Sequence, residues 1–517
     1  MSGRNRDDNF IGMDTSKSVV KSNIAEYFDG KTVFLTGATG FLGKLILEKI
    51  LRACKSVKAV YILVRSKKGV HIDERIEALF AGPAMDRLKK ENPKFRQQVE
   101  IIPGDLLLPH LGMSEGSIRK FKENVNIVIH CGASVRFDQM IREATYANVR
   151  SVKHLIEFSK EARGLQSFLY ISTAYSHCPQ ELIKEEFYQP PIQHNALIQL
   201  VDILDRETLE KITPILLGEW PNTYSYTKAV AESLIQLEGG CLPIAIVRPS
   251  IIIGAVNEPI PGWIDSIYGP TGLFLLGSLG IVRTAYGNRH QKKSYNEANN
   301  RNSGTNSVSE EMIPIYNYCY SPNLPVLTWD KMLRAMYNAG YESFATTRIL
   351  WFPGGSMKTN KYYHEFAKFF NMMPAYIADF YFKITGKEQM AVDKMKRVFA
   401  ALDVIGYFTR RNWKFDINNT QKLFKSLNSE DQRLFEFDMD TFHLETYISE
   451  YLKCIRVYIL KDPMDTIRAG QWHGQKLRAI YFLYWGLIYG YLLYWLKRLI
   501  VPRLPNLKSK ISIKLFQ

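Results

Sequence analysis

The fold is decided by residues 32–43, which read TVFLTGATGFLG. A short, largely apolar run, 32–36, leads directly into glycines at positions 37, 40 and 43. Apolar residues then recur at the spacing of an amphipathic helix, namely Leu42, Leu45, Ile46, Ile50 and Leu51. The stretch therefore predicts a strand, a glycine-rich turn and a helix over 41–51.

The three glycines have different physical reasons to stand where they do. Gly37 permits the tight turn, Gly40 lets the backbone approach a phosphate, and Gly43 lets the helix pack closely on the sheet. The N-terminus of the helix adds unpaired N–H groups and a partial positive charge. In this context the pattern predicts a dinucleotide cofactor, bound by Gly37, Thr39, Gly40, Phe41, Leu42 and Gly43.

Further apolar runs follow, separated for the most part by helical patterns. They are Ala59–Val64, Val99–Ile102, Asn126–Ile129, Ser167–Ile171 and Ile244–Val247. Most are continuously apolar, as expected of strands that are buried on both faces of a parallel sheet. The sequence therefore predicts an α/β fold with a Rossmann-type doubly wound parallel sheet.

The end of the second predicted strand indicates which dinucleotide is bound. The chain reads VRSKK over 64–68, with cations where an NAD site usually has a carboxylate. Arg65 is expected to pair with a 2′-phosphate, which favours NADPH; the alternative is a solvated loop residue. Asp105, after the third strand, is expected to lie at the adenine amino group.

A proton-transfer pair is predicted in residues 222–229, NTYSYTKA. Tyr224 and Lys228 are four residues apart and share one helix face. We expect the ammonium to lower the pKa of Tyr224, which suits proton transfer at a carbonyl oxygen. Thr173, after the fifth strand, is expected to hold the same oxygen, and Asn148 to join Lys228 through a water molecule.

Composition narrows the classes of protein and of partner. The chain has 517 residues, enough for two or three domains, and 46% are hydrophobic, which excludes a mainly disordered chain. The net charge of +16 suggests anionic partners, but no basic stripe is interleaved with aromatic residues, so nucleic acid is not predicted. The six cysteines form no CxxC pair, and no metal site is predicted.

The two ends of the chain differ in character. Residues 1–24 are polar and charged, without the apolar region of a secretory signal, and predict a flexible tail. Residues 479–496 contain no charge, and as a helix they would be ~27 Å long. We expect a membrane-anchoring segment over 461–517, with the rest of the chain facing the cytosol. A buried core helix is the alternative, and spanning or interfacial placement stays open.

Together these motifs resemble the extended short-chain dehydrogenase/reductases, and more narrowly the alcohol-forming fatty acyl-CoA reductases. The resemblance covers about residues 25–286 and resumes near Ile313. It rests on TGATGFLGK (36–44), LVR (63–65), SVRFD (134–138), STAY (172–175), NTYSYTKA (222–229), IVRPS (246–250), EPIPGWID (258–265) and NWKF (412–415).

The resemblance implies a reaction and an organisation. A long-chain fatty acyl-CoA would be reduced twice by NADPH to a primary alcohol, through a bound aldehyde and with release of CoA. Tyr224 would protonate the alkoxide, Lys228 would hold the nicotinamide ribose, and Thr173 would orient the carbonyl. A reductase domain (25–354) would precede a smaller helical domain (355–460) and an anchor in the peroxisomal or endoplasmic reticulum membrane, and a homo-oligomer is left open.

One segment departs from the family. Residues 287–312 read GNRHQKKSYNEANNRNSGTNSVSEEM, with six Asn in 26 residues, where family members have an apolar helix. The sequence predicts an atypical polar loop there. Two alternatives to an active acyl-CoA reductase therefore remain, namely a catalytically impaired NADP-binding member and a reductase of another membrane lipid such as a sterol. Residues 263–267 and 273–281 are expected to line an acyl channel, with ordinary core as the alternative.

Overall fold

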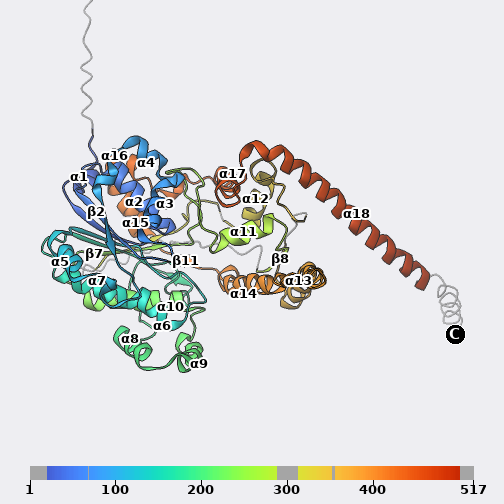
Figure 1. Ribbon diagram of the computed structural model, residues 1–517, viewed down its shortest axis with the longest axis horizontal. Coiled ribbons are helices and arrows are strands. Elements are labelled where there is room, and N and C mark those ends of the chain that lie inside the picture. The colour runs from blue at the N-terminus through green and yellow to red at the C-terminus, as the bar shows by residue number, and fades with distance from the viewer. Residues whose placement is uncertain (1–19, 68, 288–312, 326, 352–355, 501–517) are drawn as a thin grey trace, which may run out of the picture.

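The computed structural model describes residues 20–500 except for 68, 288–312, 326 and 352–355. Within these residues a seven-stranded parallel sheet has the order β3-β2-β1-β4-β5-β7-β9 (Figure 1). Its strands are β1 (Thr32–Thr36), β2 (Ala59–Val64), β3 (Val99–Pro103), β4 (Ile127–His130), β5 (Ser167–Ile171), β7 (Ile244–Pro249) and β9 (Ile315–Tyr318). The predicted doubly wound sheet is confirmed, and β9 is an additional strand that the sequence did not predict.

The sheet reverses its direction of growth between β1 and β4. Leu35 of β1 pairs with Ile62 of β2 on one side and with Ile129 of β4 on the other. The chain adds β2 and β3 on the first side, and β5, β7 and β9 on the second. Ligands of open α/β sheets bind at such a switch point, beyond the carboxyl ends of the strands.

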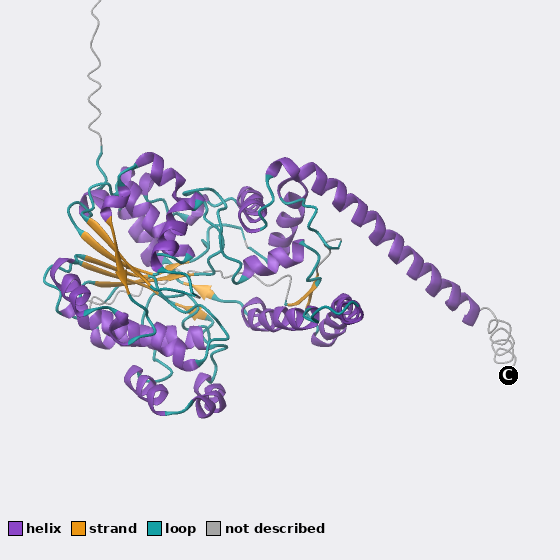
Figure 2. Cartoon of the chain, viewed as in Figure 1, coloured by secondary structure: helices purple, strands orange, loops and turns teal. Residues whose placement is uncertain are grey.

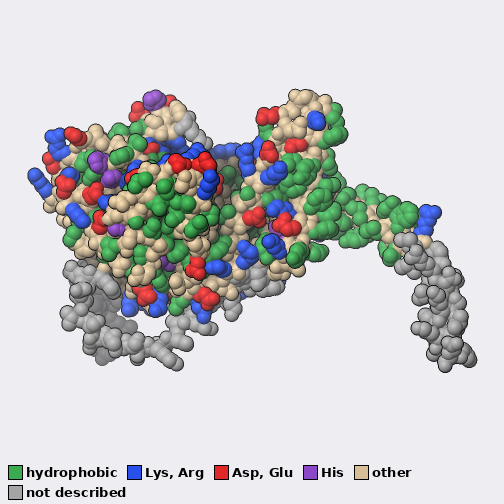
Figure 3. All heavy atoms as spheres, turned by 90° about the horizontal axis from the view of Figure 1, so that it is seen from below, with side chains coloured by type: hydrophobic (Ala, Val, Ile, Leu, Met, Phe, Trp, Pro, Cys, Tyr) green, Lys and Arg blue, Asp and Glu red, His purple; other side chains and the backbone are tan. Residues whose placement is uncertain are grey.

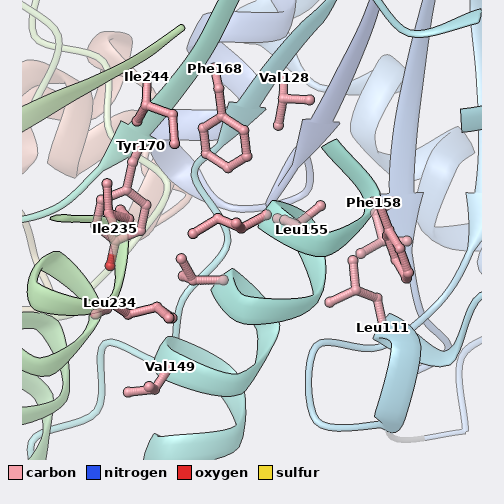
Figure 4. Packing of buried hydrophobic residues seen from close by; sticks show 14 of the residues in the cluster. Leu111, Val128, Val149, Leu155, Phe158, Phe168, Tyr170, Leu234, Ile235 and Ile244 are labelled. Atoms are coloured by element: carbon pink, nitrogen blue, oxygen red, sulfur yellow. The ribbon is translucent and has the colours of Figure 1, made fainter. Parts of the chain in front are cut away.

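Helices cover both faces of this sheet (Figure 2). The α-helices up to residue 278, not all of which lie on the sheet, are α1 (Asn23–Tyr27), α2 (Phe41–Ala53), α3 (Ile72–Ala81), α4 (Asp86–Glu91), α5 (Glu115–Asn124), α6 (Ile141–Thr145), α7 (Ser151–Lys160), α8 (His194–Ile203), α9 (Arg206–Leu217), α10 (Thr223–Glu238) and α11 (Pro270–Ser278). On one face, Phe168 and Tyr170 of β5 pack with Leu155 of α7 and Ile235 of α10 (Figure 4). The fully buried strands explain why their sequences are continuously apolar.

The second half of the chain is mainly helical, as predicted. Its helices are α12 (Trp329–Ser343), α13 (Lys361–Ile384), α14 (Ala391–Arg410), α15 (Asn418–Ser426), α16 (Ser429–Leu434) and α17 (Leu444–Cys454). Two small parallel pairs join distant segments: β8 (Thr284–Tyr286) with β10 (Ser356–Lys358), and β6 (Leu182–Ile183) with β11 (Lys414–Phe415). The second pair brings the helical part of the chain to the loop that follows β5.

The two ends differ in part from expectation. Helix α1 begins at Asn23, inside the predicted tail 1–24, because Ser22 caps it and donates to Asp431 Oδ1 at 2.5 Å. At the other end, α18 (Ile467–Ile500) projects from the body (Figure 1). It is long and apolar enough to cross a membrane, and none of its apolar window is buried, so it is not the core helix considered as the alternative.

Candidate active site

The glycine turn between β1 and α2 leaves no room for side chains. Gly37 has a φ of +76°, and a Cβ there would lie 2.8 Å from the backbone N of Gly132, which follows β4. A Cβ at Gly43 would lie 2.1 Å from the carbonyl oxygen of Gly37. Gly40 is the N-cap of α2, where its backbone leads into the free N–H groups of the first turn. The turn therefore exposes backbone, and not side chains, at the switch point of the sheet.

Two guanidinium groups lie beside this turn. Arg65, at the end of β2, donates to Asp105 Oδ2 at 2.8 Å. Arg75 of α3 donates to Thr39 Oγ1 at 2.8 Å and also to the backbone oxygen of Arg65. Burial and the charge of Arg65 lower the pKa of Arg75. Sequence reasoning missed Arg75 because only the tertiary structure brings α3 back to the turn. The arrangement can bind a phosphate through two cations.

A buried stack connects the turn with the predicted lysine. Thr36 Oγ1 accepts from Gly132 N at 3.0 Å and lies 2.7 Å from His130 Nδ1. The His130 ring stacks on Tyr170, and Lys228 Nζ donates to the Tyr170 hydroxyl at 3.2 Å. Burial and the charge of Lys228 lower the pKa of His130 to about 3, so the ring is neutral at pH 7.

Tyr224, Thr173 and Lys228 are brought together at the carboxyl end of β5. The hydroxyl of Thr173 lies close enough to the phenol of Tyr224 to lower its pKa, and Lys228 Nζ donates to the backbone oxygen of Ile171 at 2.8 Å. Thr173 and Lys228 are buried, and Tyr224 is partly exposed. This is the cluster that the sequence predicted from the spacing of Tyr224 and Lys228.

The predicted effect of Lys228 on the tyrosine is not what the structure shows. Burial raises the pKa of Tyr224 to about 12, against a smaller lowering by the hydrogen bond to Thr173. Burial also lowers the pKa of Lys228 to about 8, against the charges of Cys131 and Glu232. Burial therefore decides the pKa of Tyr224. The ammonium of Lys228 donates instead to Tyr170 and to a backbone carbonyl. Tyr224 is therefore a protonated donor at neutral pH.

Asn148 lies in a π-helical turn, Tyr146–Arg150, which re-aims its amide toward α10. Its Oδ1 accepts from Ser134 N at 2.8 Å, and its Nδ2 donates to Thr227 Oγ1 at 2.9 Å. Asn148 thus contacts the residue that precedes Lys228. The water relay to Lys228 stays a prediction.

Sequence reasoning missed a buried ionic network one turn beyond Lys228. Glu232 accepts hydrogen bonds from Arg248 Nη2 at 2.6 Å and from His177 Nε2 at 3.1 Å. It also accepts from Ser172 and, at 3.0 Å, from Ser176. Burial raises the pKa of Glu232, but Arg248 and His177 outweigh it and hold that pKa well below its usual range. Glu232 therefore fixes the loop on both sides of Thr173.

Aromatic residues from both parts of the chain gather beside Tyr224. Phe137 lies 5.9 Å from the Tyr224 ring and stacks on Phe408 of α14 at 5.7 Å. Phe408 also packs edge-on against Tyr175, at 5.2 Å. Trp413 Nε1 donates to the backbone oxygen of Cys178 at 3.0 Å, which ties the cover to the loop after β5. We call Phe137, Tyr175, Phe408 and Trp413 the aromatic cover.

The segments expected to line an acyl channel lie on the other side of the glycine turn. Trp263 stacks on Phe41 at 5.4 Å, and Lys44 pairs with Asp265, so residues 263–265 are held against α2. The indole nitrogen of Trp263 is buried without a hydrogen-bond partner among the described residues. Phe274 of α11 is also buried. The polar segment predicted at 287–312 lies outside the described residues from position 288 onward.

Two further features lie apart from this site. A cavity of about 210 Å³ between α6 and α9 is lined in part by Gln139, Arg142 and Leu209, and contains none of the predicted site residues. The described part of the chain contains no group of three or more His, Cys, Asp or Glu side chains arranged to hold a metal ion.

Two family models match the chain, and both describe a male sterility protein. The NAD-binding model covers residues 35–300, and the second, named Sterile, covers residues 370–462. Fatty acyl-CoA reductase 1 of Pongo abelii is 36% identical over 468 residues, which span 89% of this chain and 90% of the relative. The human protein of the same name is 35% identical with the same coverage. The Drosophila melanogaster fatty acyl-CoA reductase wat is 32% identical over 478 residues.

Solved structures share the fold at low sequence identity. The terminal R domain of the myxalamid biosynthetic pathway superposes with a TM-score of 0.52 at 18% identity, covering 84% of this chain and 93% of that one. The reductase domain of a nonribosomal peptide synthetase from Mycobacterium tuberculosis gives 0.50 at 16% identity, with 84% and 95% covered. These likenesses show that the chain has the fold of reductase domains.

Proposed function

The chain belongs to the fatty acyl-CoA reductase family, and we propose that it reduces a long-chain fatty acyl-CoA to a primary alcohol with two NADPH, through a bound aldehyde and with release of CoA. The observation that carries this proposal is the contact between Thr173 and Tyr224, with Lys228 one turn along the same helix. This cluster stands at the carboxyl edge of the sheet, on the side where the glycine turn opens.

The residues at the turn fit NADPH. At Gly37 and Gly43 any Cβ would collide with neighbouring backbone, so no side chain can stand there. The N–H groups in the first turn of α2 are then open to a pyrophosphate. Arg75 donates to Thr39 and to the backbone oxygen of Arg65, so two guanidinium groups lie near the turn to pair with a 2′-phosphate. Asp105, paired with Arg65, would lie at the adenine.

The chemistry divides among this chain's own side chains. When bound, NADPH supplies the hydride to the carbonyl carbon. Tyr224, whose pKa is raised by burial, donates its proton to the carbonyl oxygen as negative charge develops there. The Thr173 hydroxyl orients that oxygen, and Lys228, cationic below about pH 8, would hold the nicotinamide ribose by donating hydrogen bonds to it. Asn148 supports the lysine side of the site through Thr227.

Retention of the aldehyde is assigned to the aromatic cover. Phe137 separates Tyr224 from Phe408, and Tyr175 and Trp413 close the same side with apolar rings. A cover of this kind excludes water from the site and retains the aldehyde. The second reduction can then follow at the same tyrosine. The apolar segments 263–267 and 273–281 would hold the acyl chain beyond the glycine turn.

We also assign the chain to a membrane. Helix α18, with its core at 479–496, would anchor it in the peroxisomal or endoplasmic reticulum membrane, while the reductase domain (25–354) and the helical domain (355–460) face the cytosol. Attachment would place the site where long acyl chains partition.

The experiment that tests this function measures products from the full chain in membranes. Long-chain acyl-CoAs are supplied with NADPH or NADH, and fatty alcohol and aldehyde are quantified by gas chromatography. Tyr224→Phe should abolish both products, while Tyr226→Phe, a buried neighbour on the same helix, should retain activity. Equal loss in both variants, or full activity in Tyr224→Phe, would overturn the assignment of Tyr224.

A further inference from the structure

Helix α13 is apolar on the face that it turns to solvent. Eleven of its large apolar side chains are exposed, which is unusual for a soluble surface. They are Tyr362, Tyr363, Phe366, Phe369, Phe370, Met373, Tyr376, Ile377, Phe380, Tyr381 and Ile384. Tyr362 is 86% exposed, and Ile384 is 69% exposed. This set is called the α13 stripe below.

The α13 stripe is continuous along the helix. At 100° per residue its members fall within about 140° of the helix circumference, and no charged residue falls between them. The opposite side of the helix carries His364, Asn371 and Ala375, all buried. The helix therefore buries two polar side chains, His364 and Asn371, and exposes most of its large apolar ones, unlike an ordinary surface helix.

Hydrogen bonds hold α13 in this orientation. Asn371 Nδ2 donates to the backbone oxygen of Ile281 at 2.9 Å, and its Oδ1 accepts from Arg283 N at 2.8 Å. His364 Nδ1 lies 3.3 Å from Thr284 Oγ1. Turning the α13 stripe inward would break these buried contacts, so the outward apolar face is a fixed property of the fold.

The same segment also lies near the middle of α18, at Tyr481 and Tyr484. The pKa of Arg283 is lowered by burial, against the opposing influence of Tyr481 and Tyr484, which places that side chain near α18. Trp351 packs edge-on against the same two tyrosines, at 6.4 and 6.2 Å. The two helices thus flank one segment, and hydrophobic side chains gather on this part of the surface and continue along α18 (Figure 3).

We propose that α13 is a second membrane contact, lying in the plane of the bilayer interface with the α13 stripe inserted among the lipid chains. The inference rests on the membrane attachment in the proposed function. A bilayer is the favoured occupant because α13 and a helix of bilayer-crossing length flank the same segment, and because the stripe is rich in Phe and Tyr. Residues 361–397 also carry seven basic and four acidic side chains, a net +3 that suits anionic lipid.

This placement has a consequence for the substrate. The inner side of α13 holds residues 281–284, which directly follow the apolar helix α11 and its neighbours, proposed to line the acyl path. An acyl chain dissolved in the bilayer would then enter beside α13 without crossing water.

The experiment uses the full chain with Cys241→Ser, which removes the exposed native thiol. An environment-sensitive fluorophore is attached at Phe370→Cys on α13, at Leu487→Cys on α18, or at Ile215→Cys on α9, which is 80% exposed. The protein is reconstituted in vesicles of neutral and anionic lipids whose acyl chains are brominated. We expect quenching at 370 several-fold stronger than at 215.

The position on α18 separates the two proposals. Quenching at 487 with none at 370 would overturn the inference and leave the anchor intact. Quenching at 370 with none at 487 would support the inference and remove α18 as the anchor. Fluorescence at 370 that is unaffected by brominated lipid but changes with the protein-to-lipid ratio would indicate that a second copy of the chain covers the α13 stripe. That result would also overturn the inference.

A functional variant gives an independent readout. Phe369→Glu and Ile377→Glu place charges in the α13 stripe without touching the catalytic cluster, and Ile215→Glu is the matched control. We expect the KM for long-chain acyl-CoA presented in vesicles to rise about tenfold, with kcat unchanged, in the α13 variants alone. An unchanged KM in both α13 variants would contradict insertion of the stripe.

Discussion

Replacing Glu232 by Gln should destabilise the protein more than any other conservative change on α10. The side chain of Arg248 has no exposed area, and Glu232 is its ion-pair partner. Gln keeps the shape but removes the charge, so a buried guanidinium is left without a counter-ion. Breaking a buried pair in this way costs about 3–5 kcal/mol of unfolding free energy. With ~2.1 cal/mol/K of unfolding entropy per residue, a chain of this size should lose about 3–5 °C in Tm.

The sign of the pH dependence follows from the lowered pKa of Glu232. Its folded pKa lies below its ordinary value of 4.5, so the stabilisation is fully present above that pH and is lost as the pH falls toward the folded pKa. The difference in unfolding free energy between wild type and Glu232→Gln should therefore be constant near neutral pH and shrink below about pH 4.5. Denaturant and thermal unfolding of the purified protein, followed by tryptophan fluorescence, measure it.

Two variants make this prediction refutable. Glu238→Gln, on the same helix, removes a half-exposed carboxylate that pairs with His194 at 2.7 Å, and should cost less than about 1 kcal/mol. Glu232→Gln combined with Arg248→Met removes both buried charges and should regain part of the loss. A Glu232→Gln loss no larger than that of Glu238→Gln would refute the account of the network. Because Ser172 and Ser176 flank Thr173, kcat should also fall in Glu232→Gln.

Three further outcomes are expected. Arg65→Ala and Arg75→Ala should each raise the KM for NADPH about tenfold, with little change for NADH, because each removes a cation from the phosphate site. In pH profiles, kcat/KM should fall as the pH rises through about 8, where Lys228 loses its proton, and Lys228→Arg should move this fall to higher pH. Gly43→Ala should abolish cofactor binding in calorimetry, because its Cβ would lie 2.1 Å from the Gly37 oxygen.

Two of these outcomes have a control variant on the same chain. Arg96→Ala removes an exposed cation that pairs with Glu77, and should leave both cofactor KM values unchanged. Gly116→Ala adds a Cβ with 3.9 Å to its nearest neighbour, and should bind cofactor normally. Equal preference for NADPH and NADH in wild type would contradict the phosphate site, and a flat profile between pH 7 and 9 would contradict the role of Lys228.

The features predicted correctly are those that short, continuous stretches of sequence determine. Six strands of the sheet were recognised as largely apolar runs; β1 and β4 are buried along their whole length, whereas β3 and β5 are only partly buried. β9 was missed because its four residues, IYNY, alternate and follow a polar segment. The glycine turn was recognised because its glycines stand at positions with no room for a side chain. In the structure, a Cβ at Gly37 or Gly43 would clash with neighbouring backbone.

The features that were missed depend on residues far apart in the chain. Arg75 reaches Thr39 only because α3 folds back over the turn, and Glu232 meets Arg248 only across α10 and β7. The cover over Tyr224 joins residues 137 and 408, a contact that no local pattern encodes. The sequence shows that Lys228 lies four residues after Tyr224, so the pKa of Tyr224 was predicted to fall. The sequence does not show the burial that raises this pKa.

One site, centred on Tyr224, is proposed to reduce the acyl carbon twice with NADPH. The most direct test supplies the membrane-bound full chain with a long-chain acyl-CoA and NADPH deuterated on the transferred position, and determines the mass of the alcohol. We expect an alcohol with two deuterium atoms on C1, little free aldehyde, and no product from Tyr224→Phe. An aldehyde with one deuterium as the end product, or an alcohol made equally well by Tyr224→Phe, would contradict it.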